Sequence, residues 1–130
     1  RRDAQVTLLK GQGAEIVLNS SEAGFEEALH DACHEHNTHL AFDAVAGPLT
    51  GRLLKAMPPG SKVTVFSALS RQAIEASPSQ MIFENKAIDS FWLGPHISKQ
   101  SVVKTMRLWK RAQRQITGDL KSKIRKIYPL

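Results

Sequence analysis

The stretch Ala41–Ser70, AFDAVAGPLTGRLLKAMPPGSKVTVFSALS, decides the fold. A strand is predicted over Thr38–Ala44, and the turn Ala46-Gly47-Pro48 follows it. A helix is expected next, because apolar residues recur at helical spacing between Leu49 and Met57 and a Pro-Pro-Gly sequence then ends it. The β-branched run Lys62–Phe66 predicts a second strand. Two strands joined by tight turns to a one-faced helix predict a βαβ unit, and hence a parallel sheet.

The same alternation extends to both sides of this stretch. Toward the N-terminus we predict a helix over Asp3–Lys10, a buried strand over Ala14–Leu18 and a helix over Gly24–His36. Toward the C-terminus, the apolar and aromatic segment Met81–Leu93 is expected to be partly strand, and Ser98–Gln115 is expected to be a long basic helix. The predicted class is therefore α/β, with a parallel sheet and helices on both of its faces.

Two further features of the C-terminal part are the apolar stripe of the basic helix and the final run of residues. Val102, Met106 and Trp109 lie on one side of the basic helix and are expected to form its buried stripe. The final run, Leu120–Leu130, fits a helix by the spacing of its apolar residues, but part of it also fits a strand before Pro129. Periodicity alone leaves these two alternatives open.

Length and composition restrict the class of protein. A chain of 130 residues fits one domain, and its apolar stretches are all far shorter than the ~20 residues that span a bilayer. A single cysteine, Cys33, cannot form an internal disulfide, and no secretory signal opens the chain. We therefore expect a cytoplasmic protein with no membrane partner. Residues 97–130 carry ten basic residues and one acidic residue, an asymmetry that can mark an anionic partner.

Candidate binding residues follow the predicted strands, because an open parallel sheet binds ligands beyond the carboxyl ends of its strands. Small residues at two of these turns let backbone amides approach a flat or charged ligand, as a dinucleotide requires, although ordinary tight turns explain them about equally well. The glycine fingerprint G-x-G-x-x-G is absent. The candidates are Arg1 and Arg2, Asn19 and Ser20, Asp43, Ala44, Val45, Ala46 and Gly47, and Ser67, Ala68 and Leu69.

Several motifs in a characteristic order resemble the medium-chain dehydrogenase/reductase superfamily. They are LLKGQGAEIVLN at 8–19, the stretch 41–70, FENKAIDSFWL at 83–93 and GDLKSKIRKIYPL at 118–130. The resemblance is greatest to the zinc-binding dehydrogenase, quinone reductase and enoyl reductase branches. It covers nearly the whole chain and depends on the order and spacing of weak motifs.

The resemblance implies an incomplete Rossmann-type sheet that lacks its first βα unit, with the glycine fingerprint and a separate catalytic domain lying upstream. Residues 1–116 would be part of an NAD(P)-binding domain, and 117–130 would return toward the absent catalytic domain. The substrate would be a small molecule bound through that domain. Residues Met81–Leu93 would form a homodimer interface.

The resemblance also suggests NADP(H) as the cofactor. Arg1 and Arg2 stand where NADP-preferring relatives place a basic side chain for the 2′-phosphate, although two solvated terminal arginines are an alternative explanation. Residues Ala44–Gly47 and Ser67–Leu69 match loops beside the nicotinamide half. Phe91 and Leu93 match the strand near the nicotinamide.

The sequence supports three other kinds of site less well: a metal site, a catalytic residue and a nucleic-acid site. His30, Cys33 and His34 could face one metal ion, but His36 and His39 should project elsewhere, so we expect no metal site. Asp43 has no neighbouring nucleophile motif, and no catalytic residue is assigned to this chain. The basic helix lacks an aromatic-lined groove, so a solvated face is favoured over a nucleic-acid site.

The sequence supports two functions from different classes. The first is the cofactor-binding portion of an NADPH-dependent oxidoreductase, related to alcohol dehydrogenases and quinone reductases, that reduces quinones, enones or related carbonyl compounds by hydride transfer. This portion alone is expected to be inactive. The alternative is a stand-alone α/β binding or regulatory module that engages an acidic partner through its basic C-terminal helix.

Overall fold

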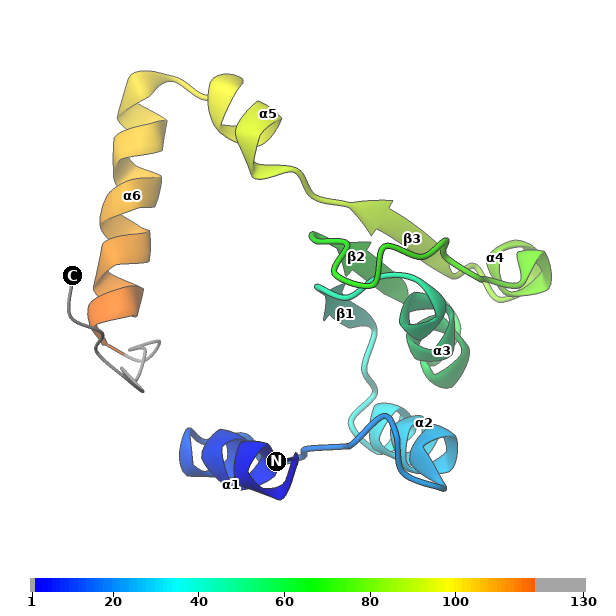
Figure 1. Ribbon diagram of the computed structural model, residues 1–130. Helices are drawn as coiled ribbons and strands as arrows, with labels where there is room; N and C mark the ends of the chain where they lie inside the picture. Colours follow the sequence, from blue (N-terminus) through cyan, green and yellow to red (C-terminus); the bar gives the residue numbers. More distant parts are fainter. Residues whose placement is uncertain (1, 119–130) are drawn as a thin grey trace. The chain divides into compact units, whose positions relative to one another are not determined.

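A three-stranded parallel sheet organises the protein. The computed structural model describes residues 2–118, which fall into two compact units, one up to Phe91 and one from Trp92 onward. The first unit contains the sheet, in the order β1 (Leu40–Asp43), β2 (Lys62–Val65) and β3 (Ala87–Ser90) (Figure 1). The strands follow one another in both sequence and space, so the predicted α/β class with a parallel sheet is confirmed.

The core lies between this sheet and the helix that connects β1 with β2. Helix α3 (Pro48–Ala56) places Leu54 against Val63 of β2, and both side chains are fully buried with Met57. Helix α2 (Phe25–Glu35) packs on α3 and adds Cys33. Burying each large apolar side chain contributes about 1.5–3 kcal/mol, so this small cluster is the main source of stability in the first unit.

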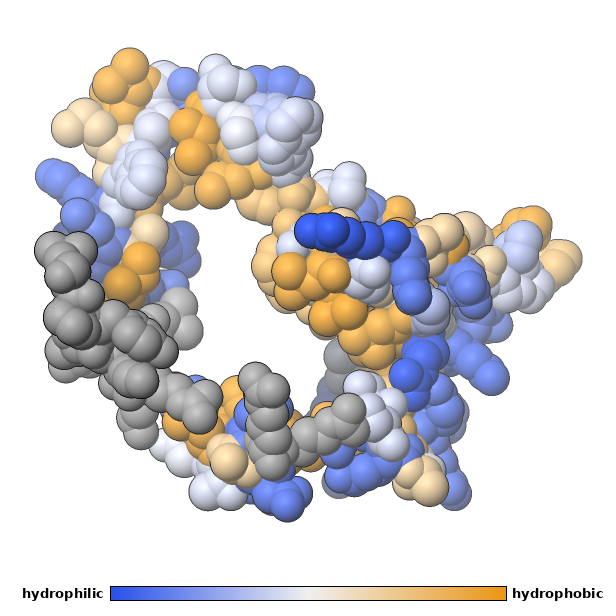
Figure 2. Space-filling view, viewed as in Figure 1, coloured by the Kyte–Doolittle hydropathy of each residue, from blue (hydrophilic) through white to orange (hydrophobic). Residues whose placement is uncertain are grey.

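No described helix of the first unit packs closely on the opposite face of the sheet. Phe42 is 68% exposed there, and Figure 2 shows hydrophobic residues at the surface over the strands. On the same face Lys62 Nζ lies 3.0 Å from Asp89 Oδ2. Hydrogen bonds from Thr64 and Lys62 hold the pKa of Asp89 below its ordinary value. Helices were predicted on both faces of the sheet, but the closely packed helices, α2 and α3, lie on one face only.

The segment before α2 differs from its prediction. Helix α1 (Arg2–Gly11) forms as expected, but Ala14–Leu18 is neither a strand nor buried; it is an irregular segment with Ile16 exposed. The run has the composition of a strand, yet it makes no ladder with β1–β3. A strand is stabilised by hydrogen bonds to a neighbour, and the described residues supply no neighbour for this one.

Among the described residues, α4, β3, α5 and α6 follow β2. Helix α4 (Pro78–Phe83) precedes β3, so the prediction that Met81–Leu93 is partly strand is confirmed for Ala87–Ser90. The second unit contains α5 (Leu93–Ser98) and α6 (Val102–Thr117). No helix among the described residues is long and apolar enough to cross a membrane.

The predicted basic helix begins later than expected. Ser98 ends α5, and the Ser101 hydroxyl accepts a hydrogen bond from the Lys104 amide, which starts α6 at Val102. The predicted buried stripe is wrong within residues 2–118, because Val102, Met106 and Trp109 are all exposed. The run Leu120–Leu130 lies outside the described residues.

Candidate functional site

The turn after β1 is built around one buried carboxylate. Asp43 is 2% exposed, and its Oδ1 accepts hydrogen bonds from the amides of Val45 (2.7 Å) and Ala46 (3.0 Å). Its Oδ2 accepts a hydrogen bond of 2.7 Å from the Thr50 hydroxyl in the first turn of α3. Each of these partners donates a hydrogen bond to the carboxylate. Asp43 therefore fixes the turn and the start of α3 relative to β1. This geometry agrees with a structural role for Asp43 and leaves its carboxylate enclosed.

The backbone of this turn takes conformations that few residues adopt. Ala46 has φ of 62° and Gly47 has φ of 70°, both in the left-handed region. A Cβ on Gly47 would lie 2.7 Å from Ser70 Oγ, so glycine permits the turns after β1 and β2 to touch. The approach of Ser70 to this glycine could not be predicted, because the two residues are distant along the chain.

The turns after β1 and β2 form one connected surface. The Leu69 amide donates to Ala44 O (3.4 Å), and the Ser70 amide donates to Val45 O (2.8 Å). Val45, Ala68 and Leu69 are exposed, whereas Ala46 and Gly47 are buried. The structure thus brings Ala44–Gly47 together with Ser67–Leu69 at the carboxyl ends of adjacent parallel strands, as predicted.

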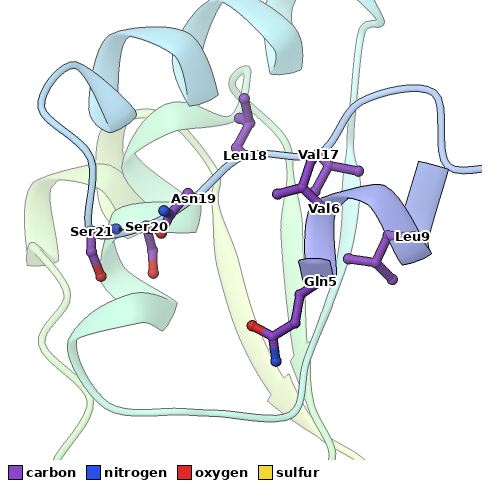
Figure 3. Close-up of a pocket in the computed structure, with 8 residues that line it drawn as sticks. All are labelled: Gln5, Val6, Leu9, Val17, Leu18, Asn19, Ser20 and Ser21. Carbon is purple, nitrogen blue, oxygen red and sulfur yellow. Dashed lines mark hydrogen bonds between the residues drawn. The ribbon is translucent and has the colours of Figure 1, made fainter. Parts of the chain in front are cut away.

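A hollow lies between α1 and residues 17–21 of the segment that follows it. Its volume is about 250 Å³, and Figure 3 shows side chains from α1 on one side and from the later segment on the other. Asn19 belongs to this wall; its Nδ2 donates to Glu22 Oε1 (2.8 Å) and its Oδ1 accepts from the Ser21 amide (3.2 Å). The lining residues are Gln5, Val6, Leu9, Val17, Leu18, Asn19, Ser20 and Ser21.

Sequence reasoning assigned only Asn19 and Ser20 of this pocket. Val6 and Leu9 have the spacing of an amphipathic helix and no binding motif, and Gln5 belongs to no motif either. Thr50, which anchors Asp43 across six intervening residues, was missed in the same way. Both omissions are tertiary contacts without a sequence signature.

The structure describes only some of the remaining predicted residues in full. Arg1 lies outside the described residues, and for Arg2 only the backbone is described, at the start of α1. Phe91 directly follows β3, and its amide donates to Val65 O (2.9 Å). Leu93 begins α5 in the second unit and is exposed.

The histidine cluster on α2 does not converge. The rings of His30 and His34 stack with centroids 4.1 Å apart, and His30 Nδ1 lies 3.3 Å from Asp31 Oδ1. Cys33 is buried, on the side of α2 that faces the core. Among the described residues, no group of three His, Cys, Asp or Glu side chains is arranged to hold a metal ion.

The fold and the paired turns define a Rossmann-type α/β protein, and comparison with known families specifies it further. The family model described as zinc-binding dehydrogenase matches residues 1–110. The chain belongs to this family, within the medium-chain dehydrogenase/reductase superfamily.

Individual relatives agree with this membership. A crystal structure from Mesorhizobium loti, named as an NADPH:quinone reductase, is 31% identical and has a TM-score of 0.80, covering 95% of this chain and 36% of its own. A mitochondrial 2-enoyl thioester reductase heterodimer from Candida tropicalis shares the fold at 20% identity, with a TM-score of 0.77 over 98% of this chain and 36% of its own.

Sequence comparison identifies a further group of relatives. The mitochondrial enoyl-[acyl-carrier-protein] reductase of Rattus norvegicus is 29% identical over 85 residues, which are 65% of this chain and 23% of the rat protein. The chain therefore spans about a quarter of the length of the curated relatives that it matches.

Proposed function

We propose that this chain is the cofactor-binding part of an NADPH-dependent oxidoreductase. The observation that carries the proposal is the pair of hydrogen-bonded turns at the carboxyl ends of β1 and β2, in a chain of the zinc-binding dehydrogenase family. In open parallel sheets this edge is where ligands bind. Small residues recur in the two turns, Ala44–Gly47 and Ser67–Leu69, where backbone amides can approach a ligand closely.

The residues present fit a dinucleotide in two places. The pocket between α1 and Asn19 combines apolar side chains with amide and hydroxyl groups, which suits an adenosine, and Arg1 and Arg2 would hold a 2′-phosphate beside it. The two turns, with Phe91, would lie along the nicotinamide half, whereas Leu93 belongs to the second unit and stays a prediction of the family resemblance. When bound, NADPH supplies the hydride, and this chain's residues bind and orient it.

The substrate class is inferred from the relatives. Their names include NADPH:quinone reductase and enoyl-[acyl-carrier-protein] reductase, so we expect a quinone, an enone or a related activated carbonyl compound. No residue of this chain is assigned to catalysis. Residues 1–116 would form part of the cofactor domain, and 117–130 would lead toward a catalytic domain that binds the substrate.

The setting and assembly of the protein are further parts of the proposal. Buried Cys33 suits a reducing compartment such as the cytoplasm, although the curated relatives are mitochondrial. A homodimer through Met81–Leu93 is supported by the exposed edge of the sheet at β3 and by Phe83, which is 83% exposed. Analytical ultracentrifugation tests this interface: Phe83→Asp should shift a dimer to monomer, and an unchanged dimer would exclude it.

A second candidate is an interaction module that binds an acidic partner through α6. The favouring observation is the concentration of Lys and Arg on this helix, which contains no acidic residue. Such a module would bind polyanions in a strongly salt-dependent manner and would ignore nucleotides.

A fluorescence titration of the intact parent protein with NADPH and NADH separates the two candidates. We expect NADPH to bind more tightly, and Arg1→Ala/Arg2→Ala to weaken NADPH by at least about tenfold while leaving NADH nearly unchanged, since each charge-assisted phosphate contact contributes about 1.5–3 kcal/mol. Arg114→Ala, at an exposed position of α6, is the matched control. Failure of both nucleotides to bind would reject the oxidoreductase proposal.

A further inference from the structure

The second unit contains a basic pocket that the cofactor site does not use. Within it, α5 and the turn before α6 face one side of α6 across a hollow of about 320 Å³. Lys104, Arg107 and Arg111 recur at i, i+3 and i+7, so they line one side of the helix. The lining residues are His96, Gln100, Lys104, Arg107, Leu108 and Arg111.

The charge around this pocket is not balanced locally. Residues 92–118 contain six Lys and Arg residues and no Asp or Glu. The described ion pairs all belong to the first unit, so within residues 2–118 none involves Lys104, Arg107 or Arg111. Three cations on one side of a helix repel one another, and an anion between them would relieve that repulsion.

The pocket is bounded by a turn with fixed geometry. The Gln100 amide donates to Ile97 O (2.9 Å), and the Ser101 hydroxyl accepts from the Lys104 amide (3.4 Å). Gln100 therefore stands at a defined position beside the first turn of α6. Its carboxamide can donate to an anionic oxygen, and Leu108 supplies an apolar surface next to the cations.

We propose that this α5–α6 pocket binds the phosphate group of a small organic phosphate. Two guanidinium groups and an ammonium match the several oxygens of a phosphate, because arginine can donate two parallel hydrogen bonds to it. Leu108 and the aliphatic stems of the basic side chains would contact the organic part of the ligand. The site is separate from the turns after β1 and β2 and does not depend on the proposed function.

Isothermal titration of the full chain with pyrophosphate tests this site. Arg107→Gln/Arg111→Gln should weaken binding by at least about tenfold, because it removes two guanidinium groups that can donate charge-assisted hydrogen bonds. Lys110→Gln/Arg114→Gln removes the same charge from α6 outside this pocket and should change binding by less than about threefold. Circular dichroism would verify that both variants keep α6.

The remaining outcomes distinguish the source of the phosphate. Binding should persist in saturating NADPH; displacement by NADPH would show that the two ligands share one site and would overturn the proposal of a separate one. Equal losses in both double variants would indicate a diffuse charge effect and would also overturn it. Vesicles containing phosphatidylglycerol should bind more weakly than pyrophosphate, and vesicle binding without pyrophosphate binding would replace the pocket by a lipid-facing surface.

Discussion

At the scale of single residues, Asp43 holds the candidate site in place. Its buried carboxylate accepts two amides from its own turn and the Thr50 hydroxyl from α3, so the shape of Ala44–Gly47 depends on it. An amide in its place would offer one acceptor oxygen and would turn an NH₂ group toward donors. The position therefore links folding stability directly to the geometry of the proposed cofactor turn.

Asp43→Asn should lower the free energy of unfolding by about 2–4 kcal/mol, because hydrogen bonds to a charged group contribute about 1.5–3 kcal/mol each. Urea denaturation monitored by circular dichroism measures the change. Asp31→Asn, at an exposed carboxylate on α2, is the control and should change stability by less than about 0.5 kcal/mol. Equal effects of the two substitutions would remove Asp43 from its anchoring role.

Cys33 predicts a pH dependence of stability. Burial raises the pKa of its thiol, so the native state keeps this proton at a pH where the unfolded chain has released it. The corresponding stability is complete below the unfolded pKa and is lost as pH rises above it. Unfolding free energies at about pH 7.5 and about pH 9.5 should fall more steeply for the wild type than for Cys33→Ala. Identical slopes would contradict the burial of this thiol.

At the scale of elements, Gly51 permits the close approach of α3 to a later loop. A Cβ at this position would lie 1.7 Å from the Glu75 carbonyl oxygen, although Gly51 sits inside a helix where alanine is normally favoured. Gly51→Ala should therefore destabilise the protein by about 1–3 kcal/mol, as overpacking does.

Gly11→Ala provides the comparison for Gly51→Ala. Gly11 ends α1, and a Cβ there would meet no atom within 4 Å. We expect it to leave stability unchanged or to raise it by up to about 1 kcal/mol, from helix propensity alone. Thermal denaturation of both variants measures the difference, and a neutral Gly51→Ala would show that the loop near Glu75 moves away without cost.

The elements also show what the sequence could predict. Helices α1–α3 and strands β1 and β2 follow the predicted segments, because periodicity, Gly and Pro are local signals. Ala14–Leu18 was wrongly predicted as a buried strand, since pairing depends on a neighbour that composition does not reveal. The start of α6 was missed because Ser101, rather than the apolar pattern, determines it.

The candidate site likewise contains residues that could be predicted from the sequence and contacts that could not. Residues at the turns after β1 and β2 could be predicted, because the ends of parallel strands meet at one edge of the sheet. Their hydrogen bonds to one another, through Ala44 and Val45, could not be predicted. Nor could the pocket on α1, because Gln5 and Asn19 come from segments whose approach is a tertiary property.

At the scale of the whole molecule, two surfaces of different chemistry belong to separate units. The first unit presents small-residue turns and a mixed polar and apolar pocket, which suit a dinucleotide. The second unit presents a basic pocket whose described residues, 92–118, include no Asp or Glu, which suits a phosphate. A nucleotide that bound mainly by charge would select the second unit, whereas one recognised by shape would select the first.

Hydrogen–deuterium exchange with and without NADPH tests the central claim most directly. If the chain is a cofactor-binding part of an oxidoreductase, NADPH should slow exchange at Ala44–Gly47, Ser67–Leu69 and Asn19–Ser21, and leave α6 unchanged. Protection confined to α6, with no change at the two turns, would contradict the proposed function and identify the protein as an anion-binding module.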